Sequence, residues 1–136
     1  MRKFFEKIAI ATTLLLVFAT PALAIEKCGS AKRITCVVDG DTIWLKGEKI
    51  RMMGYDTPEP STNICGGERE KALANVASRR LVQRLNKRTV TIERDGKDKY
   101  GRTLAIIRLD GVDVGDILIA EGLARSWPDG PEFWCE

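Results

Sequence analysis

The sequence predicts a single α+β domain, built as a small five-stranded antiparallel barrel that is partly closed and flanked by two helices. The chain has 136 residues, which is room for one domain at roughly 100 to 200 residues per domain. Hydrophobic residues make up 44% and charged residues 30%, the balance of an ordinary folded protein. Strand-like and helix-like patterns follow one another as three strands, a helix, two strands and a helix.

Residues 1–24 have the pattern of a secretory signal peptide and are predicted to lie outside the domain. Three basic residues precede an apolar stretch from Ile8 to Phe18, and small residues follow up to Ala24. A transmembrane anchor is the alternative, but the stretch is shorter than the ~20 residues that cross a bilayer. The domain would then comprise residues 25–136. Removal of three basic residues and one acidic residue lowers the formal net charge from +3 to +1, so net charge indicates no particular partner.

The first half of the domain is predicted to form three strands. Residues 33–38 are rich in β-branched side chains, and Asp39-Gly40 is a hairpin-type turn before a second strand at 42–46. A third strand is expected over 49–55. Two closely spaced prolines follow it, and proline cannot donate to a strand ladder. The third strand therefore ends before them.

The second half is predicted to form a helix, a hairpin and a short helix. Residues 68–86 place apolar side chains on one stripe and polar side chains on the opposite one, which indicates an amphipathic helix. Two alternating stretches, 89–94 and 102–109, are separated by a polar connection and favour a second hairpin. Asp113 is placed to cap a short helix that Gly122 ends. Five strands and two helices fit the OB-fold barrel.

Four cysteines lie in the part predicted to be exported, where the redox environment favours disulfides. An even number fits two bridges, and four cysteines allow three pairings. We expect Cys28 to pair with Cys36, closing a short loop at the start of the barrel, and Cys65 to pair with Cys135, tying down the C-terminal tail. A zinc site is the alternative, but no two cysteines have the short spacing that such sites use.

The chain contains no histidine, which excludes Ser-His-Asp hydrolysis, Cys-His nucleophiles and histidine-ligated zinc. Charged residues instead fall at strand ends or within apolar strands, where they need a partner or a ligand. Asp41 and Asp56 are oxygen donors suited to Ca²⁺ or Mg²⁺. Arg51 and Arg102 have planar guanidinium groups that match a phosphate. Each feature alone also fits an ordinary turn or a solvated surface, but together they indicate metal-assisted phosphoryl transfer.

Four motifs in order carry a resemblance to a known family. They are VVDGDTIWL at 37–45, IRMMGYDTPE at 50–59, DKYGRTLA at 98–105 and EGLA at 121–124. In order and spacing they resemble the staphylococcal nuclease (thermonuclease) family. The resemblance runs from about residue 34 to residue 127 and so spans most of the predicted domain.

The resemblance implies a role for each matching residue. Asp41 and Asp56 match the two calcium-ligand aspartates, and Thr57 matches the residue whose backbone carbonyl reaches the same ion. Glu59 matches the general base proposed for the attacking water, and Arg51 and Arg102 match the arginines that hold the scissile phosphate. The remaining matches are the acid beside the metal ligands and two residues near the bound nucleotide, namely Asp39, Lys99 and Tyr100.

The function that the resemblance implies is an exported, Ca²⁺-dependent endonuclease. Its partners would be DNA and RNA, cut with little sequence specificity, and we expect a monomer free of the membrane once the signal peptide is removed. A non-catalytic module that binds nucleic acid or protein is the alternative, because one fold can host both. An oligosaccharide-binding barrel is disfavoured, since it would not explain paired arginines beside three acids.

The sequence departs from the family pattern at two places. The chain ends about a dozen residues after the EGLA motif, so the C-terminal region that lines the nucleotide side of the pocket is predicted to be shortened. The loop from residue 60 to residue 67 is rebuilt around Cys65. Base preference and the path of the substrate strand are therefore expected to differ.

Overall fold

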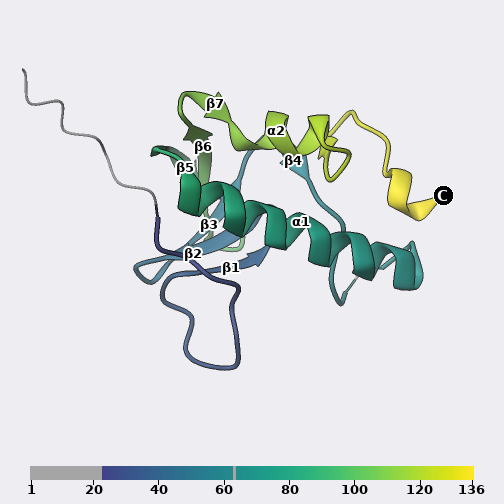
Figure 1. Cartoon of the computed structure of the whole chain (residues 1–136), viewed down its shortest axis with the longest axis horizontal. Helices are drawn as coiled ribbons and strands as arrows, with labels where there is room; N and C mark the ends of the chain where they lie inside the picture. The colour runs from purple at the N-terminus through teal and green to yellow at the C-terminus, as the bar shows by residue number, and fades with distance from the viewer. Residues whose placement is uncertain (1–22, 63) are drawn as a thin grey trace, which may run out of the picture.

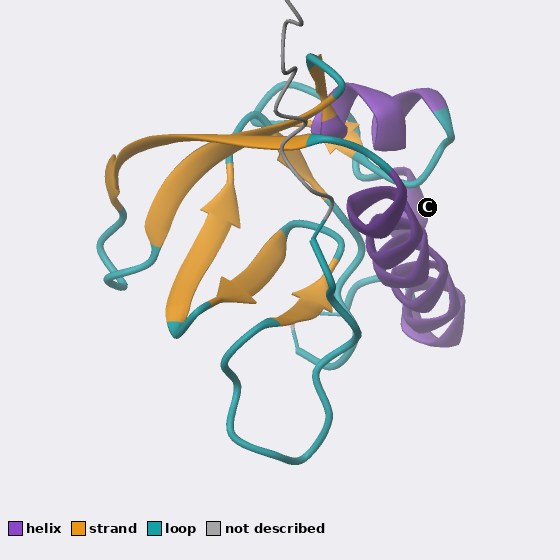
Figure 2. Cartoon of the chain, turned by 60° about the vertical axis from the view of Figure 1, so that its left-hand side comes forward, coloured by secondary structure: helices purple, strands orange, loops and turns teal. Residues whose placement is uncertain are grey.

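The computed structural model describes residues 23–62 and 64–136, which form a mixed sheet with two helices (Figures 1 and 2). The helices lie together on one side of the strands (Figure 2). The elements are β1 (Cys36–Asp39), β2 (Thr42–Leu45), β3 (Glu48–Met52), β4 (Tyr55–Asp56), α1 (Gly67–Lys87), β5 (Val90–Lys97), β6 (Thr103–Leu109), β7 (Val112–Asp113), α2 (Val114–Ala120), β8 (Arg125–Ser126) and the short 3₁₀ helix η1 (Phe133–Cys135).

The main sheet has the strand order β1-β2-β3-β6-β5, with β7 added beside β6. The expectation of a wholly antiparallel sheet is wrong, because β3 and β6 pair in parallel. A parallel pair needs a crossover, and the segment that contains α1 and β5 supplies it. The five expected strands are all present, and closure of the sheet into an OB-fold barrel stays a prediction, since no pairing joins β1 to β5 within the described residues.

The third predicted strand is interrupted near its end. The ladder of β3 stops at Met52, and the chain turns at Gly54, whose φ of +80° lies in the region that favours glycine. The next two residues form β4, which pairs with β8 in a separate two-stranded sheet. This break directs Asp56 toward the C-terminal part of the chain instead of continuing the main sheet.

Helix α1 extends one residue beyond each end of the predicted helix and packs against β1. The apolar stripe is buried as expected at Ala77, Leu81 and Leu85, whereas Val76 is exposed. A helix turns by 100° per residue, so Val76 lies at the edge of the stripe. A carboxyl group that the pattern did not flag, Glu70, is also buried.

The second hairpin and the short helix are confirmed. Strands β5 and β6 pair antiparallel, and β5 continues to Lys97 through a bulge. Asp113 caps α2, because its carboxylate accepts a hydrogen bond of 2.8 Å from the backbone N–H of Gly115. Gly122 follows the helix with a φ of +72°, the conformation of a glycine stop.

Both disulfides join the cysteines that the sequence predicts to pair. Cys28 is bonded to Cys36 and Cys65 to Cys135, each with its Cα atoms 4.9 Å apart. The first bridge closes a loop next to β1. The second joins the loop before α1 to η1, so the C-terminal tail lies near the start of α1 (Figure 1).

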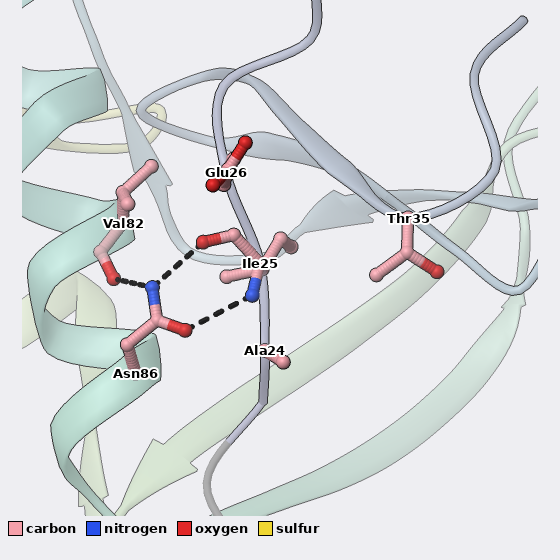
Figure 3. Close-up of a pocket in the computed structure, with 6 residues that line it drawn as sticks. All are labelled: Ala24, Ile25, Glu26, Thr35, Val82 and Asn86. Carbon is pink, nitrogen blue, oxygen red and sulfur yellow. Dashed lines mark hydrogen bonds between the residues drawn. The ribbon is translucent and has the colours of Figure 1, made fainter.

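The segment before β1 is held by the end of α1. Asn86 accepts a hydrogen bond from the Ile25 amide (2.9 Å) and donates to the carbonyl oxygens of Ile25 (2.7 Å) and Val82 (2.8 Å) (Figure 3). Ile25 itself is buried in the core. The predicted signal peptide lies almost wholly outside the described residues. Among the described residues, no helix is long and apolar enough to cross a membrane.

Candidate active site

The structure brings Asp41 and Asp56 together around one arginine. Asp41 lies in the turn between β1 and β2, Asp56 ends β4, and Arg51 lies in β3 between them. The Arg51 Nη2 atom is 3.4 Å from Asp41 Oδ2 and 3.7 Å from Asp56 Oδ1. Its Nη1 donates to the carbonyl oxygens of Met52 (2.6 Å) and Tyr55 (3.2 Å). Arg51 is therefore held by the bend between β3 and β4.

Asp41 is the most buried acid of this cluster, with 3% of its surface exposed. Its Oδ2 accepts hydrogen bonds of 3.2 Å from both the backbone N–H and the hydroxyl of Thr57, and its Oδ1 accepts one of 2.9 Å from Thr42. A Cβ at Gly40 would come within 2.6 Å of the Thr57 methyl group. The turn therefore needs glycine at position 40 so that Asp41 can approach Thr57.

Burial and mutual repulsion raise the pKa values of the clustered acids. Burial, together with the neighbouring Asp39, raises the pKa of Asp41 to about 6. Burial, together with Asp41 and Asp56, raises the pKa of Glu59 to about 7. Burial also raises the pKa values of Asp39 and Asp56. The acids of the cluster are therefore protonated more readily than free carboxyl groups.

Glu59 is half-buried beside the two aspartates, and its backbone is held by Glu70. The Glu70 Oε1 atom accepts a hydrogen bond of 3.1 Å from the Glu59 amide, and Oε2 accepts one of 2.8 Å from the Gly66 amide. A fully buried carboxyl group on α1 thus fixes both ends of the loop between β4 and α1. The role of Glu70 could not be predicted from the sequence, because Glu70 lies in a run of charged residues at the start of an amphipathic helix.

Arg102 and Arg51 both line a cavity of about 370 Å³. The Arg102 Nε donates to Asp98 Oδ2 at 2.6 Å, which positions the guanidinium group. Tyr100 is 71% exposed, Trp127 is 54% exposed, and both line the same cavity. The Lys99 ammonium lies 5.1 Å from the Tyr100 ring. The two predicted phosphate-binding arginines and the two predicted nucleotide-contacting residues therefore surround one space.

A larger cavity, of about 630 Å³, lies at the N-terminal segment beside Ile25 and Asn86 (Figure 3). It shares no lining residue with the cavity between the two arginines. Ala24, Val82 and Thr35 line it as well, and it contains neither a cluster of acids nor an arginine. We therefore place the candidate chemistry at the cavity of about 370 Å³, because Arg51 lines it and also lies beside Asp41 and Asp56.

The acids fit a hard divalent cation. Carboxylate and carbonyl oxygens are the ligands that Ca²⁺ prefers, and the carboxylates of Asp41 and Asp56 lie within 4 Å of the same Arg51 nitrogen. Asp41, Asp56 and Thr57 would hold the ion. A second group of potential ligands is formed by Cys65, Glu70 and Cys135, whose ligand atoms lie within 4.8 Å of one another. Its two sulfurs are bonded to each other, however, and are not thiolates.

The chain thus combines two helices on a mixed sheet with an acidic cluster at the first hairpin and two arginines that line one cavity. The family model described as "Staphylococcal nuclease homologue" matches residues 49–131. The chain therefore belongs to this family, and the resemblance to it that the sequence indicates is confirmed.

Relatives with assigned names are similar over much of the chain. A protein named thermonuclease from Staphylococcus intermedius is 37% identical over 106 residues, which cover 72% of this chain and 60% of the relative. Endonuclease YncB of Bacillus subtilis is 36% identical over 96 residues, covering 65% of this chain and 44% of the relative. An uncharacterized endonuclease of Haemophilus influenzae is 31% identical over 121 residues, covering 85% and 62%. The chain thus spans less than two thirds of the length of these relatives.

Proposed function

We propose that this chain is an exported, Ca²⁺-dependent endonuclease that hydrolyses phosphodiester bonds in DNA and RNA with little sequence specificity. The observation that carries the proposal is the cluster of buried acids at Arg51, which adjoins a cavity lined by Arg51, Arg102 and two exposed aromatic rings. The names of the relatives support the nuclease activity. We further propose that the active chain is a monomer.

The reaction that these residues support is attack of water on phosphorus. Glu59 accepts a proton from the water, whose oxygen forms a bond to phosphorus while the bond to the leaving sugar oxygen breaks. Negative charge grows on the non-bridging oxygens as this happens, and Arg51 and Arg102, which both line the cavity, stabilise it. When bound, the ion supplies Lewis-acid polarisation of a phosphoryl oxygen. Asp39 supports the ligand turn, because its Oδ1 accepts a hydrogen bond from the Asp41 amide at 3.3 Å.

The aromatic side chains favour an unpaired nucleic-acid strand. Exposed rings at Tyr100 and Trp127 offer faces on which bases can stack, and this type of contact tolerates every base. Lys99 adds a positive charge beside Tyr100. The C-terminal tail departs from the family pattern and places Trp127 on the wall of the cavity, so we propose a substrate contact that is specific to this chain.

Export is supported by the two disulfides, which persist in oxidising compartments. The predicted signal peptide is consistent with it, and N-terminal sequencing of the secreted protein would test it. A mature N-terminus at Ile25 is expected. A chain recovered only with residues 1–24 attached would contradict the proposed processing.

The test of the function is digestion of labelled single-stranded DNA and RNA with Ca²⁺ and with a chelator. We expect both substrates to be cut with Ca²⁺ and neither with chelator. The Glu59→Gln variant keeps the shape of the side chain but removes the base, so it should bind the substrates and cut them at a rate lower by about 10²-fold or more. Binding without cutting by the parent chain would favour the non-catalytic module instead.

A further inference from the structure

Arg125, a residue that follows the last of the four motifs, is nearly buried beside the candidate metal ligands. Only 8% of its surface is exposed. It lies in β8, and the pairing of β8 with β4 sets it directly opposite Asp56. Its Nε donates a hydrogen bond of 3.0 Å to Asp56 Oδ2. The strand register therefore places Arg125 beside Asp56, so the pair does not depend on a chance contact between two surface side chains.

The other two nitrogens of Arg125 are held by the C-terminal tail, residues 127–136. Its Nη1 donates to the carbonyl oxygen of Gly130 (2.8 Å), and its Nη2 donates to Glu132 Oε1 (2.9 Å). The guanidinium carbon lies 4.9 Å from the Trp127 ring centre and 5.9 Å from that of Trp134. Three hydrogen bonds in different directions, together with two aromatic rings, therefore fix the orientation of the Arg125 guanidinium group.

The tail is itself anchored. Trp134 is 2% exposed, and η1 packs against α1. The neighbouring Cys135 is bonded to Cys65, and a Cβ at Gly66 would collide with the Trp134 carbonyl oxygen. The disulfide and this close packing therefore hold in place the C-terminal tail that contacts Arg125.

This arrangement determines which oxygen of Asp56 can serve an ion. Arg125 engages Oδ2, and this leaves Oδ1 on the side of Arg51, 3.7 Å from its Nη2. The same Nη2 atom is 3.4 Å from Asp41 Oδ2. One oxygen from each aspartate thus lies within 4 Å of the same Arg51 nitrogen. We propose that Arg125 is a positioning residue that orients Asp56 for Ca²⁺ and that the anchored tail holds Arg125 in place. This inference rests on the function proposed above.

Two effects of Arg125 on Ca²⁺ have opposite signs, and the test must separate them. Its positive charge repels the ion, so loss of the charge would tighten binding, whereas loss of orientation would weaken it. Arg125→Lys keeps the charge but cannot make the planar set of hydrogen bonds. Trp134→Phe keeps all charges and alters the packing of the C-terminal tail beside Arg125. Arg94→Lys, at an exposed ion pair with Glu48, and Trp44→Phe, in β2, are the matched controls.

The experiment is calorimetric titration of each purified protein with CaCl₂, with circular dichroism of the metal-free proteins as a check of folding. We expect Arg125→Lys to weaken Ca²⁺ binding by about 10-fold or more, and Trp134→Phe to weaken it in the same direction. The double variant should lose no more than Arg125→Lys alone, because both changes act on one element. Both controls should stay within about 2-fold of the parent, and excess Ca²⁺ should restore the turnover of Arg125→Lys.

A folded Arg125→Lys protein with the parent's affinity would overturn the positioning role while leaving the proposed function intact. If Arg125→Lys does not fold, Trp134→Phe decides, and an unchanged affinity in that variant has the same meaning. A parent chain that binds no Ca²⁺ would instead overturn the proposed metal dependence, and the inference about Arg125 would fall with it.

Discussion

Replacement of Asp41 by asparagine should make the metal-free protein more stable while removing its response to Ca²⁺. The pKa of Asp41 is raised from 3.8 to about 6 in the folded chain. Between those pH values the folded chain binds more protons than the unfolded chain, so the free energy of unfolding falls as the pH rises. Above pH 6 the full cost of the buried charge is present. One pKa unit corresponds to 1.36 kcal/mol, which makes this cost about 3 kcal/mol.

Asparagine keeps the shape of the side chain and removes that cost. Its amide oxygen can accept the hydrogen bonds from Thr57, and its NH₂ group can donate to the Thr42 hydroxyl, but the attraction to Arg51 is lost. We therefore expect Asp41→Asn to raise the free energy of unfolding by about 1 to 3 kcal/mol at pH 8. The gain should disappear near pH 4, where Asp41 is protonated in the parent.

Urea unfolding of parent and variant at pH 4, 6 and 8, in chelator and in Ca²⁺, measures this. Ca²⁺ should stabilise the parent at pH 8 and leave Asp41→Asn unchanged, because binding to the folded state alone adds stability. Asp129→Asn, at an exposed position, is the control and should change neither quantity. A variant that is less stable than the parent at pH 8 in chelator, or stabilised equally by Ca²⁺, would refute the reasoning.

Three further predictions concern other parts of the molecule. Arg102→Lys keeps a positive charge but loses the planar fork held by Asp98, so the turnover number should fall by about 10²-fold, and an unchanged value would exclude a role in the transition state. Replacement of Cys65 and Cys135 by serine should lower the free energy of unfolding by about 4 kcal/mol, since this bridge spans 70 residues. The control is a double serine variant of the Cys28–Cys36 bridge, which spans 8 residues. Urea unfolding midpoints should show a smaller loss of stability for the control. Asn86→Ala should cost about 1 to 3 kcal/mol through the unpaired Ile25 backbone, and unfolding data matching the parent would show that the N-terminal segment adds no stability.

Much of the fold could be predicted because local patterns determine it. The period of the apolar residues gave α1 and both hairpins, and the cap at Asp113 followed from a residue type that accepts backbone hydrogen bonds. The parallel pairing of β3 with β6 could not be predicted in this way, since it depends on the path of the whole crossover. The break at Gly54 was missed because a glycine inside a strand pattern fits a bulge as well as a bend.

The residues of the candidate site were likewise predicted from the sequence only in part. Residues from three of the motifs lie close together, with Arg51 near both Asp41 and Asp56, and Arg102 lines the same cavity as Arg51. Arg125 and Glu70 lie outside those motifs; Arg125 contacts Asp56, which is 69 residues away in the sequence, and Glu70 accepts a hydrogen bond from the Glu59 amide, which is 11 residues away. The predicted bridge from Cys65 to Cys135 was the available signal for both, because it brings the tail and the start of α1 to the same loop.

The central claim is that Glu59 acts as the base in a Ca²⁺-dependent cleavage, and the turnover number of Glu59→Gln on single-stranded DNA at saturating Ca²⁺ tests it most directly. The substitution removes a group whose pKa of about 7 suits proton transfer near neutral pH, and it leaves Asp41, Asp56 and both arginines in place. We predict a turnover number lower by about 10²-fold or more, with substrate binding retained. A turnover number within a few-fold of the parent would contradict the account.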